Sequence, residues 1–204
     1  MVETRVFSPS GVGLQQKIHY MRWATRAFAA GVVPVVTNFF SAAPNADFNV
    51  DLYEQGNALV GSGSNFTISQ IGVQVVGGAA ATFADFESVI NGCSLRIITA
   101  SKEYGIFPFF MMPQGGGIGA ASGQVSVTAA AAPGGAGGTP GLLNGVADRR
   151  AMFALAYPLT IQANQGFYCE MLAPTGGGVV PQITLTGALR IRVVLDGELD
   201  RSAS

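Results

Sequence analysis

Runs of residues that alternate between apolar and polar side chains dominate this chain after residue 31. The clearest run is the last, where one side carries the following apolar residues: Leu189, Ile191, Val193 and Leu195. Because successive side chains of a strand point to opposite faces, this period of two predicts β-strands. We predict eight strands, at residues 32–40, 65–76, 92–100, 104–112, 124–131, 152–161, 166–173 and 183–196.

Three of these runs contain irregularities that predict local structure. In 65–76 the first two apolar residues, Phe66 and Ile68, are out of phase with those that follow, so we expect a β-bulge near Ser69 and Gln70. Pro108 and Pro158 lie inside predicted strands and indicate edge strands or bulges, because proline cannot donate to a sheet ladder.

The segments between the runs are rich in Gly, Pro, Asn and Ser and show no helical period. This spacing predicts an all-β fold, an antiparallel sandwich or barrel. The tetrapeptide at 163–166, Ala-Asn-Gln-Gly, lies between two alternating runs and predicts a hairpin. The stretch from Met111 to Gly145 is rich in glycine and uncharged, and the alternating QVSVTAA within it suggests two loops around a strand rather than a linker between domains.

One segment before the strands has a helical pattern. Residues 14–30, LQQKIHYMRWATRAFAA, place apolar side chains on one face at a spacing of three or four, and Gly31 and Pro34 would end the helix. Arg22 and Arg26 are four residues apart and would repel each other on such a helix, so we expect an acidic group to face them.

The charged residues are few and unevenly distributed. Of 204 residues, 49% are hydrophobic and only 11% are charged, whereas soluble domains average about 25% charged. A surface so poor in charge favours burial against other subunits or a membrane. The net charge of −1 argues against an ordinary basic nucleic-acid-binding domain. The N-terminal 26 residues are basic and the C-terminal tail is acidic, so the basic end is either a solvated arm or contacts an acidic partner.

Membrane insertion and secretion are not favoured. The segment 27–46 is long enough to span a bilayer, but its prolines, asparagines and β-branched centre VVPVVTNFF favour a strand. The start MVETRVFSPS lacks the apolar core of a secretory signal. Cys93 and Cys169 each lie in an apolar run, which predicts buried free thiols rather than a disulfide or metal site.

Residues suited to catalysis are also few, and we expect no enzyme and no cofactor. The only histidine, His19, is most simply a polar flanking residue, and neither cysteine lies in a recognisable nucleophile context. The glycine stretch lacks both the third glycine of a dinucleotide fingerprint and a phosphate-binding lysine. The acidic group Asp47, Asp51 and Glu54 could bind calcium through loop oxygens, but it lacks the spacing and glycine of a calcium loop, and a solvated acidic loop is favoured.

Two stretches resemble the single jelly-roll proteins of virus shells and bacteriophage particles, whose strands are lettered B to I. FFSAAPNADFNVDLYEQGNALVGSGSNFTISQIGVQVV is similar to strand B, a long loop and strand C, and YPLTIQANQGFYCEM with ITLTGALRIRVVLDG is similar to strands G, H and I. The resemblance implies an eight-stranded antiparallel jelly-roll sandwich over 32–204, preceded by an N-terminal arm over 1–31 that contains the amphipathic helix.

The resemblance also implies a function. It suggests a structural protein of the virion, either a capsid (coat) protein or a decoration protein, that self-assembles into a homo-oligomer through low-charge, Gly/Ala-rich loops and also contacts other virion proteins. Neither nucleic acid as a specific partner nor a membrane is expected. The alternative is a trimeric jelly-roll head that binds a receptor or a carbohydrate. The expected assembly residues are Arg22, Arg26, Phe28, Asp196 and Glu198, with the arginines of one subunit facing the acidic tail of the next.

Overall fold

The computed structural model describes residues 4–6, 15–40, 45, 47, 51–52, 64–77, 80–100, 102–112, 118–121, 141–144, 152–163, 165–177 and 181–202. These residues form antiparallel strands and a single α-helix, so the all-β class is confirmed. Within the same ranges, no helix has the length and hydropathy needed to cross a membrane.

The larger sheet has five strands. Their order across the sheet is β1 (Thr4–Val6), β2 (Gln15–Phe28), β13 (Leu189–Ser202), β5 (Ser64–Gly77) and β10 (Phe153–Ile161). Strand β13 lies in the middle and pairs along its length with β2 on one side and with β5 on the other. Its four alternate apolar residues are at most 1% exposed, which confirms the predicted inward face: Leu189, Ile191, Val193 and Leu195.

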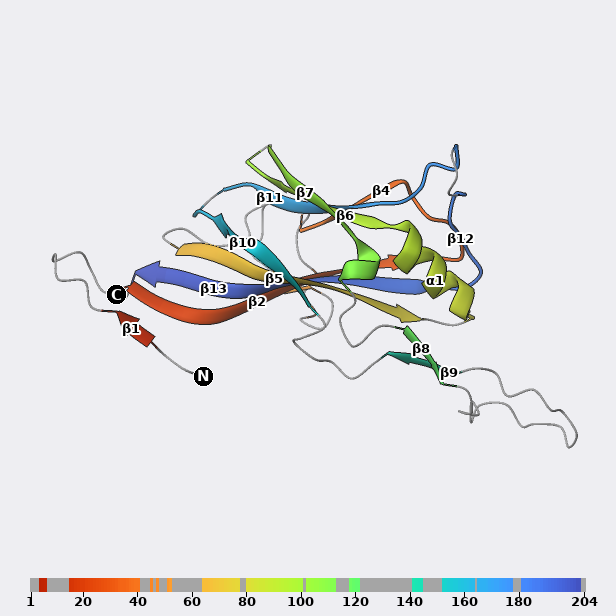
Figure 1. The fold of residues 1–204 in the computed structure, drawn as a ribbon, viewed down its shortest axis with the longest axis horizontal. Helices are drawn as coiled ribbons and strands as arrows, with labels where there is room; N and C mark the ends of the chain where they lie inside the picture. The colour runs from red at the N-terminus through yellow and green to blue at the C-terminus, as the bar shows by residue number, and fades with distance from the viewer. Residues whose placement is uncertain are drawn as a thin grey trace, which may run out of the picture.

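The second sheet has four strands and packs face to face with the first (Figure 1). Its order is β4 (Val36–Phe39), β11 (Phe167–Leu172), β6 (Ser94–Thr99) and β7 (Lys102–Pro108). The inward side chains of both sheets form one buried apolar cluster, as in other β-sandwiches. At its centre are completely buried residues from both sheets, among them Phe66, Ile71, Leu95, Ile97 and Phe167.

Shorter elements connect and cover the two sheets. Helix α1 (Phe83–Gly92) joins β5 to β6, the 3-10 helix η1 (Phe109–Met111) follows β7, and β3 (Gly31–Val32) pairs with β12 (Thr184–Leu185). The sequence prediction missed α1, although its start carries a capping box in which Thr82 and Asp85 each bind the other's backbone amide.

The helix expected at 14–30 is wrong. Residues 15–28 form β2, whose fourteen residues all pair with β13. The side chains facing the core recur every second residue, and Ala24 and Phe28 are buried among them. Arg22 and Arg26 occupy positions on that same face, so they interrupt the apolar alternation and hide the strand pattern. Pairing with a neighbouring strand then outweighs local helix propensity. The predicted arm over residues 1–31 therefore does not contain the expected helix.

The bulge expected in β5 is confirmed. Asp196 pairs with Gln70, but the next residue, Gly197, pairs with Ile68, so Ser69 is an extra residue in β5. The expected positions of both prolines are also confirmed. Pro158 lies where the pairing of the edge strand β10 with β5 shifts, and Pro108 ends the edge strand β7.

Other predicted strands agree in part. The runs at 65–76, 92–100, 152–161 and 166–173 correspond to β5, β6, β10 and β11, whereas 32–40, 104–112 and 183–196 are each divided between two elements. The hairpin expected at 163–166 is wrong, because β10 and β11 lie in different sheets and the connection crosses between them. The strand expected at 124–131 lies outside the described residues. Near the ends of the glycine stretch, β8 (Ile118–Ala121) pairs with β9 (Gly141–Asn144).

Candidate functional site

The two arginines expected at an assembly surface lie on the inward face of β2. They pair with buried residues of β13: Arg22 with Leu195 and Arg26 with Ile191. The guanidinium carbon of Arg22 lies 3.4 Å from the ring centroid of Tyr20, which is cation–π distance. Both arginines therefore have contacts inside the chain's own sandwich. The expectation that they face a neighbouring subunit stays a prediction.

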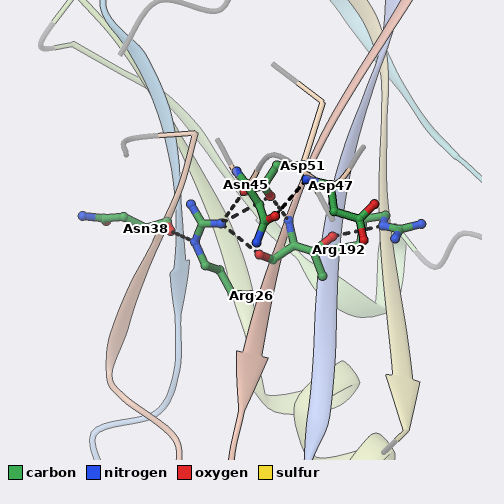
Figure 2. Close-up of polar contacts among 7 residues, drawn as sticks. Arg26, Asn38, Asn45, Asp47, Asp51 and Arg192 are labelled. Carbon is green, nitrogen blue, oxygen red and sulfur yellow. Dashed lines mark hydrogen bonds and ion pairs between the residues drawn. The ribbon is translucent and has the colours of Figure 1, made fainter. Parts of the chain in front are cut away.

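Arg26 belongs to a polar cluster where β2 approaches β4 (Figure 2). Asp51 is only 4% exposed, and its carboxylate accepts hydrogen bonds from the backbone amides of Thr25 at 2.8 Å and Asn45 at 2.9 Å. The guanidinium of Arg26 lies 3.4 Å from the same carboxylate, and its Nε donates to the carbonyl of Asn38 on β4 at 3.0 Å. The cluster thus joins the two sheets on one open side of the sandwich.

The segment around Asp51 also extends the larger sheet. Leu52 exchanges two backbone hydrogen bonds with Trp23 of β2, at 3.1 and 2.8 Å. The expected solvated acidic loop is therefore wrong for Asp51, which is buried as a structural acceptor. Asp47 lies beside it and Glu54 lies outside the described residues. Within the described part of the chain, no group of three potential metal ligands comes together.

The acidic C-terminal strand meets the basic N-terminal strand within one chain. Asp196 is 1% exposed and its carboxylate bonds to Nε2 of His19 on the neighbouring strand β2. Glu198 and Asp200 lie 3.7 and 3.8 Å from the amine of Lys17. Opposite charges of the two ends of the chain therefore meet between adjacent strands of one sheet.

Phe28 is also buried in this chain's core, at 7% exposed. Of the five residues expected at an assembly surface, Phe28 and Asp196 are thus covered by their own subunit. Arg22, Arg26 and Glu198 are partly or largely exposed but have contacts within the chain.

The opposite side of the sandwich, between β7 and β10, is apolar. The hydroxyl of Tyr104 on β7 donates to the carbonyl of Tyr157 on β10 at 2.6 Å, and the rings of Phe107 and Phe153 lie 5.5 Å apart. Five large apolar side chains around these edge strands are 38–81% exposed, and we refer to them as the apolar edge: Tyr104, Ile106, Phe110, Met111 and Tyr157. Phe109 and Met112, in contrast, are completely buried in the subunit's own core.

A second buried carboxylate fixes helix α1 to the chain before β13. Asp85 accepts hydrogen bonds from the backbone amides of Thr82, Thr186 and Gly187, at 2.8, 2.7 and 3.3 Å. Burial alone would raise the pKa of Asp85, but these hydrogen bonds to the ionised carboxylate together hold the pKa below its usual value. Sequence analysis missed this role, although the Thr82–Asp85 spacing was a usable signal.

Both cysteines are buried free thiols, as predicted. Burial raises the pKa of Cys93 to about 12 and raises the pKa of Cys169 as well. Since the thiolate is the nucleophile, these cysteines are poorly suited to catalysis at neutral pH.

Comparisons with protein-family models, curated proteins and solved structures give no match to this chain.

Proposed function

We propose that this protein is a jelly-roll structural subunit of a virus particle, a coat or decoration protein of a virion of the bacteriophage type. In this proposal it assembles with copies of itself and contacts other virion proteins, without a catalytic reaction, a cofactor, specific binding of nucleic acid or attachment to a membrane.

The observation that carries the proposal is the pairing of the eight longer strands of the two large sheets. In chain order they are β2, β4, β5, β6, β7, β10, β11 and β13. The first pairs with the last, the second with the seventh, the third with the sixth and the fourth with the fifth. This is the pairing of one long hairpin rolled into two sheets. It supports a jelly roll, a fold that recurs in viral capsid proteins.

The distribution of charge and apolar surface supports self-assembly. A chain with 11% charged residues has few groups that keep a large surface solvated. The apolar edge gathers exposed aromatic and aliphatic side chains, the composition enriched at the centres of protein interfaces. Its two strands are also the outer strands of their sheets, so they carry backbone groups that a neighbouring subunit can cover.

The test is the assembly state of the purified full-length chain. We expect sedimentation velocity at micromolar concentration to reveal a symmetric oligomer or larger species, and negative-stain microscopy to reveal rings, trimers or closed shells. A monomer that persists across protein concentrations and salt concentrations would overturn the proposal.

A further inference from the structure

A groove of about 660 Å³ lies between helix α1 and the segment leading into β12. This volume is within the range of small-ligand sites. One wall is a single face of the helix, where residues three or four apart point the same way: Ala84, Glu87, Ser88 and Asn91. The other wall consists of alternate residues of the extended segment: Gln182, Thr184 and Thr186.

The walls of this groove are held in place from both ends. At one end Asp85 of the helix accepts the backbone amides of Thr186 and Gly187. At the other end the helix packs closely on the extended segment, because a Cβ added to Gly92 would lie 3.0 Å from the side chain of Ile183. A groove fixed in this way is preorganised, so a ligand does not have to order it.

The groove is lined by apolar residues and by hydrogen-bonding side chains, most of which are uncharged. Asn91 and Gln182 each offer an amide donor and acceptor, Thr184 offers a hydroxyl, and Glu87 offers a carboxylate that accepts from hydroxyls. No side-chain hydrogen bond or ion pair joins any of these four to another described residue, so their polar atoms are available to a ligand.

We propose that this groove binds a neutral oligosaccharide. Sugar hydroxyls both donate and accept, which matches the amides, the hydroxyls and the carboxylate of Glu87 on the facing walls, while the second carboxylate, that of Asp85, is engaged by backbone amides. No lysine or arginine lines the groove, so it lacks the cations that phosphate or nucleic acid would require. The proposal does not rest on the virion function, since an unassembled subunit carries the same groove.

The experiment uses the full-length protein and a printed array of neutral di- to hexasaccharides of glucose, galactose, mannose and N-acetylglucosamine. The best array ligand is then titrated by calorimetry into the wild type and into the double variant Asn91→Ala with Gln182→Ala. We expect at least a tenfold loss of affinity in the double variant, and a smaller loss in Thr184→Val, which removes one hydroxyl at nearly constant shape. Gln162→Ala removes an exposed amide outside the groove and should bind as the wild type does.

Three results would overturn the proposal. The first is that no sugar binds at about 10 mM, a concentration beyond the millimolar range of weak binding. The second is equal affinity of the wild type and the double variant, and the third is that the groove binds an unglycosylated peptide from an array while no sugar binds. Circular dichroism confirms that each variant is folded. Sedimentation of the same samples reads the assembly state separately, so a failure of sugar binding is distinguishable from a failure of the proposed virion function.

Discussion

The hydroxyl of Ser69 donates a hydrogen bond to the backbone carbonyl of Asp196 at 3.2 Å. This bond lies at the bulge where β5 contains one residue more than β13. The bulge brings the two backbones so close that a Cβ on Gly197 would lie 1.9 Å from the carbonyl oxygen of Thr67. It also returns Phe66 and Ile68 to the core face, in phase with the inward residues of the second half of β5.

Deletion of Ser69 should therefore be tolerated. Without it, Phe66, Ile68 and Ile71 fall on one face of a regular strand, and the main loss is one hydrogen bond of about 1 kcal/mol. Deletion of Thr67 is the matched control, because it forces either Phe66 or Ile68 out of the core at a cost of about 3 kcal/mol or more. Urea denaturation of both deletions measures the difference, and equal stabilities would show that the bulge does not set the register.

Asp85→Asn should lower the free energy of unfolding by about 2–3 kcal/mol at pH 7, because the carboxylate receives three backbone amides. The folded-state pKa of Asp85 is lower than its unfolded value of about 3.9. The stabilisation by the ionised group is thus present above about pH 4 and is lost as the pH falls through the folded-state pKa. Denaturation curves at several pH values should show that the difference in the free energy of unfolding between the wild type and the variant becomes smaller in acid. A difference in unfolding free energy that does not change with pH would contradict this role of Asp85.

Cys93 and Cys169 should resist alkylation in the native protein. Both side chains are buried, and burial raises the pKa of each, so little thiolate forms or is accessible at pH 8. Mass spectrometry after iodoacetamide treatment should find no modification in buffer and two modified cysteines at a urea concentration well above the unfolding midpoint. Rapid labelling of either thiol in buffer would mean that its part of the core opens readily.

The sequence could predict the strands whose inward residues are apolar throughout. Strand β13 alternates without interruption from Leu189 to Leu195. The phase change between Ile68 and Ile71 located the bulge, because only an extra residue restores the alternation. Strand β2 could not be predicted in this way. Its inward face includes Arg22 and Arg26, and both are accommodated by contacts with residues that the sequence pattern did not connect to them, a tyrosine ring and a distant aspartate.

The candidate sites were harder to predict than the strands because they depend on pairings distant in sequence. The composition indicated that the two ends of the chain have opposite charge, and the contact between Lys17 and Glu198 agrees with this. The sequence alone could not show whether such a contact lies within a subunit or between subunits. It also gave no signal that the helix at Asp85 and the segment at Thr186 form one groove, since that depends on how the chain returns to the sandwich after β11.

Arg26→Met should destabilise the subunit itself rather than its assembly. It removes the cation beside Asp51, a carboxylate only 4% exposed, at a cost of about 2–3 kcal/mol. Asp51→Asn should cost less, because its oxygen can still accept an amide of Thr25 or Asn45, and the double variant should cost less than the sum of the two. Thermal unfolding of the four proteins measures this coupling. Additive losses would mean that the two side chains do not interact.

Charge introduced at the apolar edge should weaken assembly while leaving the subunit folded. Ile106 and Tyr157 are 51% and 81% exposed, so replacing either with lysine should change the stability of the subunit by only about 0.5 kcal/mol. If a neighbouring subunit covers this edge, the same lysine loses its hydration on association and carries no partner, which costs several kcal/mol per contact. We therefore expect Ile106→Lys with Tyr157→Lys to sediment as a smaller species than the wild type at equal concentration. Gln162→Lys adds one lysine at an exposed site outside the apolar edge and, compared with each single lysine variant of the edge, should assemble normally. If the double variant assembled as the wild type does, with an unchanged unfolding midpoint, another surface would have to carry the subunit contacts.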